Sequence, residues 1–246
     1  MKKKLITILL TSMIILSTTV TALCATKEYK ISAINLILNV SDELYAVTRN
    51  VSTGSPALDI LKTDAIKLQN LYLQNDIYLD VFPEDLSYEI LVTAVAANSQ
   101  VSDYNTASDD YFTDYMEQIR NGYNSEDDIL IDISLYENAT TKYIHTYSHN
   151  KKSDISVYVS KYHTVMNGFS YDFIIQTNDI EINENDKMNQ QFLEIIDSAQ
   201  FTQVKSSITE SSIFMEMYET FIGFGLTVLI LGVIIFLMSG KSKKNK

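Results

Sequence analysis

The chain of 246 residues contains one cysteine, two prolines, seven glycines and no tryptophan. Because the cysteine, Cys24, lies near the N-terminus and has no second cysteine to pair with, the rest of the chain must fold by packing, without disulfides. Pro56 and Pro83 lie far from the last apolar run, which excludes a proline-containing cell-wall sorting motif there. The few glycines form neither a Walker loop nor a G-x-G-x-x-G turn, so no nucleotide-binding motif is present.

Basic residues are scarce in the middle of the chain. All 31 acidic residues lie between positions 27 and 219, together with only 12 of the 19 basic ones, which gives this part a net charge of −19. Such a surface repels phosphate backbones and anionic lipid headgroups, and we therefore predict no nucleic-acid partner. Two interpretations of the charge remain: it serves solubility, or it attracts cations or a basic partner.

Long apolar runs occur only near the two ends. Three lysines precede the first run, and Val20 and Ala22 are small residues suited to a cleavage site, so residues 1–22 are predicted to be a signal peptide. Cleavage after Ala25 is a second option, and an uncleaved membrane-spanning first segment is a third. Lipid attachment at Cys24 is disfavoured because Leu23, not a small residue, precedes it.

The second apolar run predicts a membrane anchor. Residues 221–238 contain no charge, and at about 1.5 Å per residue the segment 220–240 can cross a hydrocarbon layer of about 30 Å. Glu219 precedes it and lysines follow it, as expected for a helix with a cytoplasmic C-terminus. The predicted order is a signal peptide (1–22), an extracytoplasmic domain (27–202), a juxtamembrane connector (203–219), a transmembrane helix (220–240) and a basic cytoplasmic tail (241–246). The expected location is the cell membrane, with one span and the bulk of the chain outside the cell.

The segment 27–202 is long enough for one domain with its own core. Alternating or short apolar runs predict strands at 34–40, 44–48, 77–82, 88–96, 129–135, 142–148, 155–165 and 169–176. Apolar residues at spacings of three and four predict helices at 57–75, around 112–119, and from about Asp186 onward. Asp109 and Asp110 suit the first turn of the second helix, and Gly122 suits its end. Asn167 and Gly168 tolerate positive φ and predict a hairpin between the last two strands.

These elements predict an α+β fold in which an antiparallel sheet carries helices on both faces, an α/β/α sandwich. The strand 34–40, the segment from Tyr88 to Ala94, the hairpin from Asn167 to Asp172 and the closing segment from Phe192 to Phe201 together resemble the PsbP-like α/β/α sandwich superfamily, including its bacterial surface members. The resemblance covers most of 27–202. It implies a non-catalytic fold that serves as an accessory or partner-stabilising module of membrane assemblies. It transfers no functional residue, because no binding motif of the superfamily is matched.

Motifs that carry chemistry are few. His145 and His149 have a spacing that would suit a metal on a helix, but they lie in a predicted strand and its turn; His163 lies on another strand, which pairing could bring near. The acidic runs 125–128 and 179–186 lack the glycine and the terminal glutamate of a calcium loop. No G-x-S-x-G motif is present. We therefore predict no catalytic residue, no metal site and no cofactor, and the binding residues stay unassigned.

Tyrosines are the last candidates for a binding surface. They either pack against the helices, the commoner outcome, or face outward as contacts. The tyrosines in the strand region are Tyr136, Tyr143, Tyr147, Tyr158, Tyr162 and Tyr171. The leading functional prediction is a non-enzymatic, membrane-anchored domain that binds or stabilises a membrane-protein partner. The alternatives are a small-molecule or cation-binding module for a neighbouring transporter, and a cell-envelope hydrolase, which two carboxyl groups facing each other across a cleft would favour.

Overall fold

The computed structural model describes residues 25–97, 101–123, 127–152 and 155–202. The predicted signal peptide, connector, transmembrane helix and cytoplasmic tail lie outside these residues. None of the helices within the described ranges is both long and apolar enough to cross a membrane. The description therefore concerns the predicted extracytoplasmic domain.

Seven antiparallel strands form the main sheet, in the order β3-β4-β5-β9-β8-β7-β6. Their bounds are β3 (Tyr45–Thr48), β4 (Ile77–Phe82), β5 (Tyr88–Ala96), β6 (Asp128–Glu137), β7 (Lys142–Lys152), β8 (Ile155–Met166) and β9 (Phe169–Asn178). The strand β5 lies inside the sheet, and its consecutive residues Ile90 and Leu91 are both fully buried. Because consecutive side chains point to opposite faces, both faces of the sheet are covered at this strand.

A second, three-stranded sheet has the order β1-β2-β10, with β1 (Thr26–Ile31), β2 (Leu36–Ser41) and β10 (Gln200–Phe201). The sequence predicts β2 but starts it at Ile34, which instead lies in a short 3-10 turn, η1 (Ser32–Ile34), that ends at Asn35 with φ 54°. The strand β1 escapes prediction because its residues are mostly polar and exposed. The predicted single sheet is therefore two sheets.

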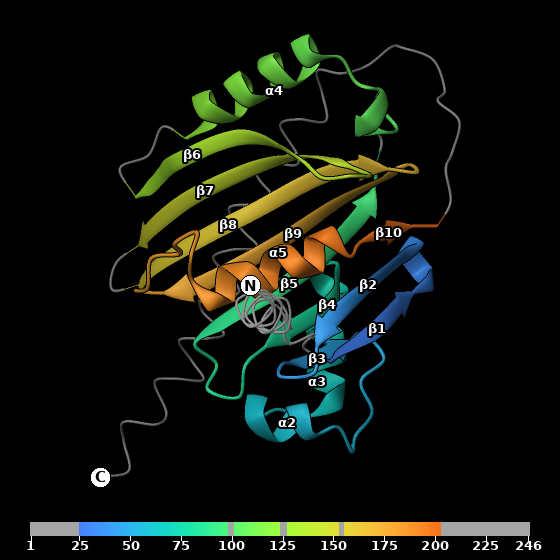
Figure 1. The fold of residues 1–246 in the computed structure, drawn as a ribbon. Helices are drawn as coiled ribbons and strands as arrows, with labels where there is room; N and C mark the ends of the chain where they lie inside the picture. The colour runs from blue at the N-terminus through green and yellow to red at the C-terminus, as the bar shows by residue number, and fades with distance from the viewer. Residues whose placement is uncertain (1–24, 98–100, 124–126, 153–154, 203–246) are drawn as a thin grey trace, which may run out of the picture.

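Helices pack on both faces of the main sheet (Figure 1). On one face, here called the α4 face, α2 (Pro56–Leu61) and α3 (Ala65–Gln74) cover Leu91 and Ile174, and α4 (Asp109–Gly122) with the 3-10 turn η2 (Tyr104–Thr106) covers Ile144 and Val165. On the other, the α5 face, α5 (Lys187–Asp197) and the small sheet cover Val92 and Phe173. The predicted α+β class with antiparallel sheets is confirmed.

The helix predicted over 57–75 is wrong in its continuity, because the chain turns between α2 and α3. Lys62 ends α2 in the left-handed conformation, with φ 53°. Asp64 then begins α3, where its carboxylate accepts the backbone N–H of Lys67 at 2.9 Å. Apolar spacing continues through this break, and for that reason the pattern alone predicts a single helix. The Asn167–Gly168 hairpin is confirmed, with φ of 56° and 75° at the two residues.

Candidate functional site

The three histidines do not converge on one site. His145 and His149 both lie on β7 and point to the α5 face, because they alternate with Ile144, which packs under α4. His163 on β8 is the register partner of Ile144 and therefore points, like Ile144, to the α4 face. Within the described ranges, no group of three or more histidine, cysteine, aspartate or glutamate side chains is placed to hold a metal ion.

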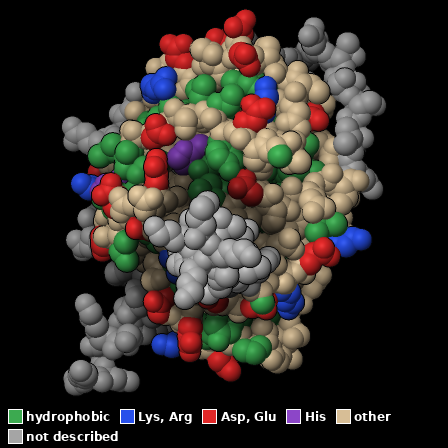
Figure 2. Space-filling view, in the orientation of Figure 1, with side chains coloured by type: hydrophobic (Ala, Val, Ile, Leu, Met, Phe, Trp, Pro, Cys, Tyr) green, Lys and Arg blue, Asp and Glu red, His purple; other side chains and the backbone are tan. Residues whose placement is uncertain are grey.

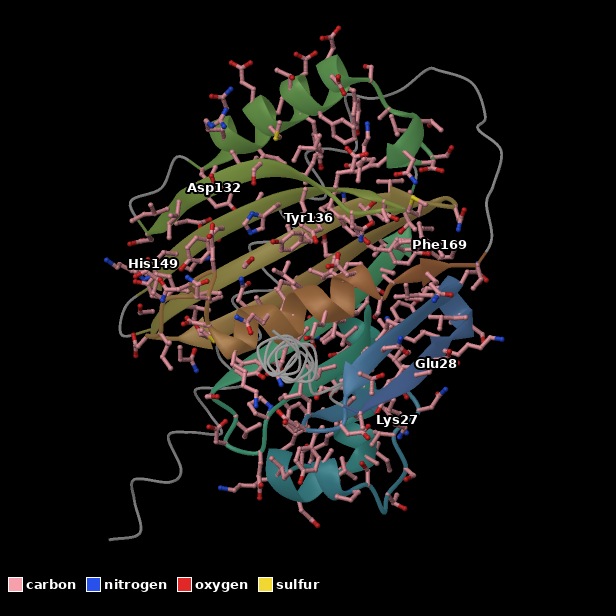
Figure 3. The ribbon with its side chains drawn as sticks, in the orientation of Figure 1. Lys27, Glu28, Asp132, Tyr136, His149 and Phe169 are labelled. Atoms are coloured by element: carbon pink, nitrogen blue, oxygen red, sulfur yellow. The ribbon has the colours of Figure 1, made fainter. Side chains whose placement is uncertain are left out.

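On the α5 face, the two histidines stack on tyrosines of the neighbouring strand. The His145 ring lies 4.4 Å from the Tyr162 ring between centroids, and the His149 ring lies 4.0 Å from the Tyr158 ring at an interplanar angle of only 7°. We call the resulting surface the aromatic shelf, which consists of Tyr136, His145, Tyr147, His149 and Tyr158. Figure 3 shows Tyr136 and His149 on the adjacent strands β6 and β7.

Hydroxyl groups fix the imidazoles of the shelf. The Nε2 atom of His145 lies 2.9 Å from Ser160 Oγ, and that of His149 lies 2.9 Å from Ser156 Oγ. Burial lowers the pKa of both histidines; the charge of Asp132 opposes this for His145, whereas Lys151 adds to it for His149. Both imidazoles are therefore mostly neutral at pH 7, and the shelf is an uncharged surface with polar ring atoms.

The tyrosines divide between packing and partial exposure. Tyr143 and Tyr171 are fully buried in the core. Tyr136 donates its hydroxyl to Asp197 Oδ1 at 2.7 Å, and the Tyr147 oxygen accepts the N–H of Ile182 at 3.0 Å, so both shelf tyrosines also hold α5 and its preceding loop in place. Since Tyr136, Tyr147 and Tyr158 stay half-buried, each still presents part of its ring to solvent.

The edge strand β6 exposes three large apolar side chains, which we call the β6 strip. They are Ile129, Ile131 and Leu135, with exposed fractions of 43%, 47% and 38%. Ile129 is the register partner of His149, so the strip joins the shelf at that point. Residues 128–133 also line a groove of about 380 Å³ with Arg120 and Tyr123 at the end of α4. Figure 2 shows hydrophobic side chains between the histidine and the acidic upper margin of this face.

The two acidic runs have different places. In the first, only Asp127 and Asp128 are described; Asp127 is exposed, and Asp128 lines the groove. The second run forms the loop between β9 and α5, where the Asp186 carboxylate accepts the backbone N–H of Asn183 at 3.0 Å. This bond shapes the turn that precedes α5, a structural role for that carboxylate.

The α4 face contains a largely buried charged cluster that the sequence analysis does not identify. His163 Nδ1 donates to Asp172 Oδ1 at 2.7 Å, and Lys161 Nζ lies 3.8 Å from the same oxygen. Burial alone would raise the pKa of Asp172, but Lys161 and His163 together lower it to about 2. The sequence does contain one sign of this cluster. Lys161 is a charged residue on the same face of β8 as Val157, Val159 and Val165, which are apolar.

A second buried polar group lies under α3. Tyr72 donates its hydroxyl to Asp80 Oδ2 at 2.6 Å, and Gln176 donates to Glu89. Burial raises the pKa of both acids, and the neighbouring Glu89 charge raises that of Asp80 further. Asp80 Oδ1, the other oxygen of this carboxyl group, receives no hydrogen bond from the described residues. Because both pKa values are raised, this pair holds a proton more readily than two ordinary carboxyl groups do.

The carboxyl pair bears on the hydrolase alternative. Asp80 is only 2% exposed and lies beneath α3 in the core formed with Tyr72 and Leu91. A glycosidase needs its two carboxyl groups on either side of a space that admits a sugar. Asp80 and Glu89 instead face each other directly, so this pair gives the hydrolase alternative no support.

The architecture is that of an antiparallel α+β domain, and comparisons with known proteins extend the description only as far as its fold. No family model matches the chain, and no curated protein matches its sequence. Among solved structures, it is similar to cyanobacterial PsbP (CyanoP) from Synechocystis sp. PCC 6803, with 11% identity and a TM-score of 0.41 over 74% of this chain and 95% of that one.

A crystal structure from Bacteroides thetaiotaomicron VPI-5482 is also similar, with 9% identity and a TM-score of 0.41 over 72% of this chain and 48% of that one. A PsbP protein is thus among the solved structures to which this chain is similar. Neither likeness assigns a ligand, a partner or a site residue to this chain.

Proposed function

We propose that this chain is a non-enzymatic, single-pass membrane protein whose extracytoplasmic domain, an α/β/α sandwich, binds a protein partner at the outer face of the membrane. The observation that carries the proposal is the contiguity of the β6 strip with the aromatic shelf. Exposed apolar residues beside half-exposed aromatic rings are typical of surfaces that bury themselves against another protein.

The chemistry of the surface favours a protein over a small ligand. The shelf is neutral at pH 7 because burial lowers the pKa of its histidines. Tyrosine and histidine rings that are already stacked lose little conformational freedom on binding. The entropic cost of ordering them at an interface is therefore small. The strip and the groove extend the contact along most of β6, which suits an elongated partner surface.

The membrane location is supported by the sequence: the uncharged run 221–238 lies between Glu219 and four lysines. The expected result is that the full chain fractionates with membranes, that external protease digests the domain in intact cells, and that a chain ending at Glu219 leaves the membrane fraction. Retention of the shortened chain in the membrane would contradict anchoring by 220–240, unless the first apolar run remains uncleaved, which N-terminal sequencing would detect.

Partner binding is tested by photo-cross-linking in native membranes. A photoreactive phenylalanine derivative replaces Tyr158 in the shelf, Ile131 in the strip, or Ile66 on α3, a control position that is 68% exposed. We expect the same partner to be joined to the chain from positions 131 and 158 and not from 66. Equal yields of adduct from all three positions would contradict the proposal. It would also be contradicted if positions 131 and 158 gave no adduct in proteins that unfold at the wild-type temperature.

A further inference from the structure

The strand β6 is the longest exposed edge of the main sheet. In the described part of the chain it pairs only with β7, and no strand lies beyond it; the opposite edge, β3, has only four residues. An unpaired edge presents backbone N–H and C=O groups that can pair with another strand. The edge of β6 is therefore a surface that a second chain could extend.

The hydrogen-bonding pattern shows which groups point outward. Asn138 donates its N–H to Thr141 O across the β6–β7 turn, so this pair faces inward between the two strands. Since inward and outward residues alternate in an antiparallel ladder, Tyr136 and Ser134 also face β7, whereas Leu135 and Ile133 direct their N–H and C=O groups away from it. An added strand would pair with these outward groups.

The side chains along β6 suit a neighbour on the same edge. Ile129 shares the α5 face with His149, while Leu135 shares the α4 face with Ile144, its register partner. Ile131 is the extra residue of a bulge, because Leu130 and Asp132 oppose the consecutive residues 148 and 147. Exposed apolar groups thus lie on both faces of the edge, where an added strand would place its alternating side chains.

The charge around this edge selects the occupant. The exposed acidic residues of α4, of β6 and of the turn before β6 are Asp109, Asp110, Asp114, Glu117, Asp127, Asp132 and Glu137. Arg120 is the basic residue of the groove. A second copy of β6 would bring like charges together, whereas a strand rich in lysine or arginine would be attracted. Figure 2 shows acidic side chains along the upper margin, where Figure 1 places α4.

We infer that the β6 edge binds an extended, positively charged segment of a partner protein as an additional strand of the main sheet. This inference rests on the proposed function and names the partner's chemistry and its mode of binding. The backbone of β6 supplies the affinity, the strip contacts the apolar side chains of the added strand, and the surrounding acids select its charge. The other long edge, β1, carries Lys27 and Lys30 beside Glu28, so it does not attract such a segment.

The test uses the full-length protein in a neutral detergent and a labelled peptide of about nine residues that alternates valine with lysine. Two control peptides are matched to it: in one, glutamate replaces lysine; in the other, alternate backbone nitrogens are methylated. Fluorescence anisotropy measures the Kd at about 50 mM and about 300 mM salt. We expect the lysine peptide to bind, each control to bind at least about tenfold more weakly, and salt to weaken binding.

Two pairs of variants locate the site. Asp132→Lys on β6 should weaken binding of the lysine peptide by about tenfold, while Glu28→Lys, an equal charge change on β1, should leave it unchanged (both positions are labelled in Figure 3). Leu135→Pro removes an outward N–H and should weaken binding further than Leu135→Thr, which keeps it. Unchanged thermal unfolding of each variant shows that its fold is retained.

Several outcomes would overturn the inference. They are equal binding of the lysine and glutamate peptides, undiminished binding of the methylated peptide, equal effects of Asp132→Lys and Glu28→Lys, and self-association through β6 in sedimentation experiments. If the peptide fails to bind while positions 131 and 158 still cross-link to a partner, the strand-addition inference is wrong and the proposed partner binding stands. If neither occurs, both fail.

Discussion

Three wholly or largely buried acids on the α4 face show how local surroundings decide the charge of a side chain. Lys161 and His163 lower the pKa of Asp172 to about 2, although burial acts in the opposite direction. Among the described residues no cation lowers the pKa of Asp80 or Glu89, and burial together with their proximity raises the pKa of Asp80 well above its ordinary value. The same face of one sheet therefore contains a stable carboxylate and a carboxyl pair that tends to hold a proton.

The carboxyl pair makes stability depend on pH. Because folding raises the pKa of both acids, the folded protein binds more protons than the unfolded chain, and stability falls as pH rises from about 4 through the raised values. Asp80→Asn keeps an acceptor for Tyr72 and removes one acid. The variant should therefore lose less stability than the wild type as pH rises. We expect the free energy of unfolding of the variant minus that of the wild type to increase by about 1 kcal/mol between pH 4 and pH 8. Urea unfolding at several pH values measures this.

The control for that variant is Asp59→Asn at an exposed position of α2. It should unfold in parallel with the wild type at every pH. A constant difference between Asp80→Asn and wild type across the pH range would show that folding does not raise the pKa of Asp80.

Asp172 has the opposite dependence on pH. Because its pKa is lowered on folding, its contribution is complete above the unfolded value near 4 and is lost as pH falls toward 2. Asp172→Asn removes the charge that Lys161 and His163 share, which should cost about 3 kcal/mol at pH 7. Chemical denaturation measures the loss, with Asp114→Asn on the exposed side of α4 as the control. A cost below about 1 kcal/mol would show that the cluster is weakly coupled.

At the scale of elements, α5 is the helix that packs against both the main sheet and the small sheet. Phe192 is fully buried, and its ring lies 5.6 Å from that of Tyr162 on β8. Ser198, at the end of α5, accepts the N–H of Asn39 on β2 at 2.8 Å, so the helix joins the main sheet to the small one. Loss of this helix would expose the core between the two sheets.

We expect Phe192→Ala to lower the free energy of unfolding by about 3 to 5 kcal/mol, because the fully enclosed ring leaves a cavity. Glu194→Ala, on the exposed side of the same helix, should change it by no more than about 0.5 kcal/mol. Both values come from urea unfolding followed by circular dichroism. Similar losses in the two variants would contradict the assignment of the buried side of α5.

The sequence predicts those elements whose apolar pattern is regular. It places β4 and β5 at their observed bounds and starts the last helix near Asn185 or Asp186, the second of which is the N-cap of α5. It misses β1, whose polar residues give no alternation, and the break at Lys62, which depends on one backbone angle. The β6 strip is visible in the sequence only as strand residues. Ile129 and Leu135 become recognisable as a surface because β6 lies at an edge, and that follows from the order of all seven strands.

At the scale of the whole molecule, protection from exchange should follow position in the sheet. The central strands β5, β8 and β9 pair on both sides and are covered on both faces, whereas β1 and β6 each have one open edge. We expect amide hydrogens of β9 to exchange slowest, and those of β1 and the outward positions of β6, such as Leu135, to exchange much faster. Hydrogen exchange with mass spectrometry on the full-length protein in detergent measures this. Slow exchange at Leu135 without a partner would mean that the β6 edge is already covered.

The connectivity of the small sheet predicts an order in which its strands pair during folding. Its strand β2 pairs with β1, which is close in sequence, and with β10, and Thr202 donates to Asn35 O across 167 positions. Closing so long a loop costs more chain entropy than pairing β1 with β2 does, so we expect the β2–β10 pairing to form after the β1–β2 pairing. While the polypeptide is being synthesised, the β2 edge that pairs with β10 stays open until residues 200–201 are available. The pairing of β10 therefore completes the small sheet, and a chain interrupted before residue 200 would leave the β2 edge free to pair with other molecules.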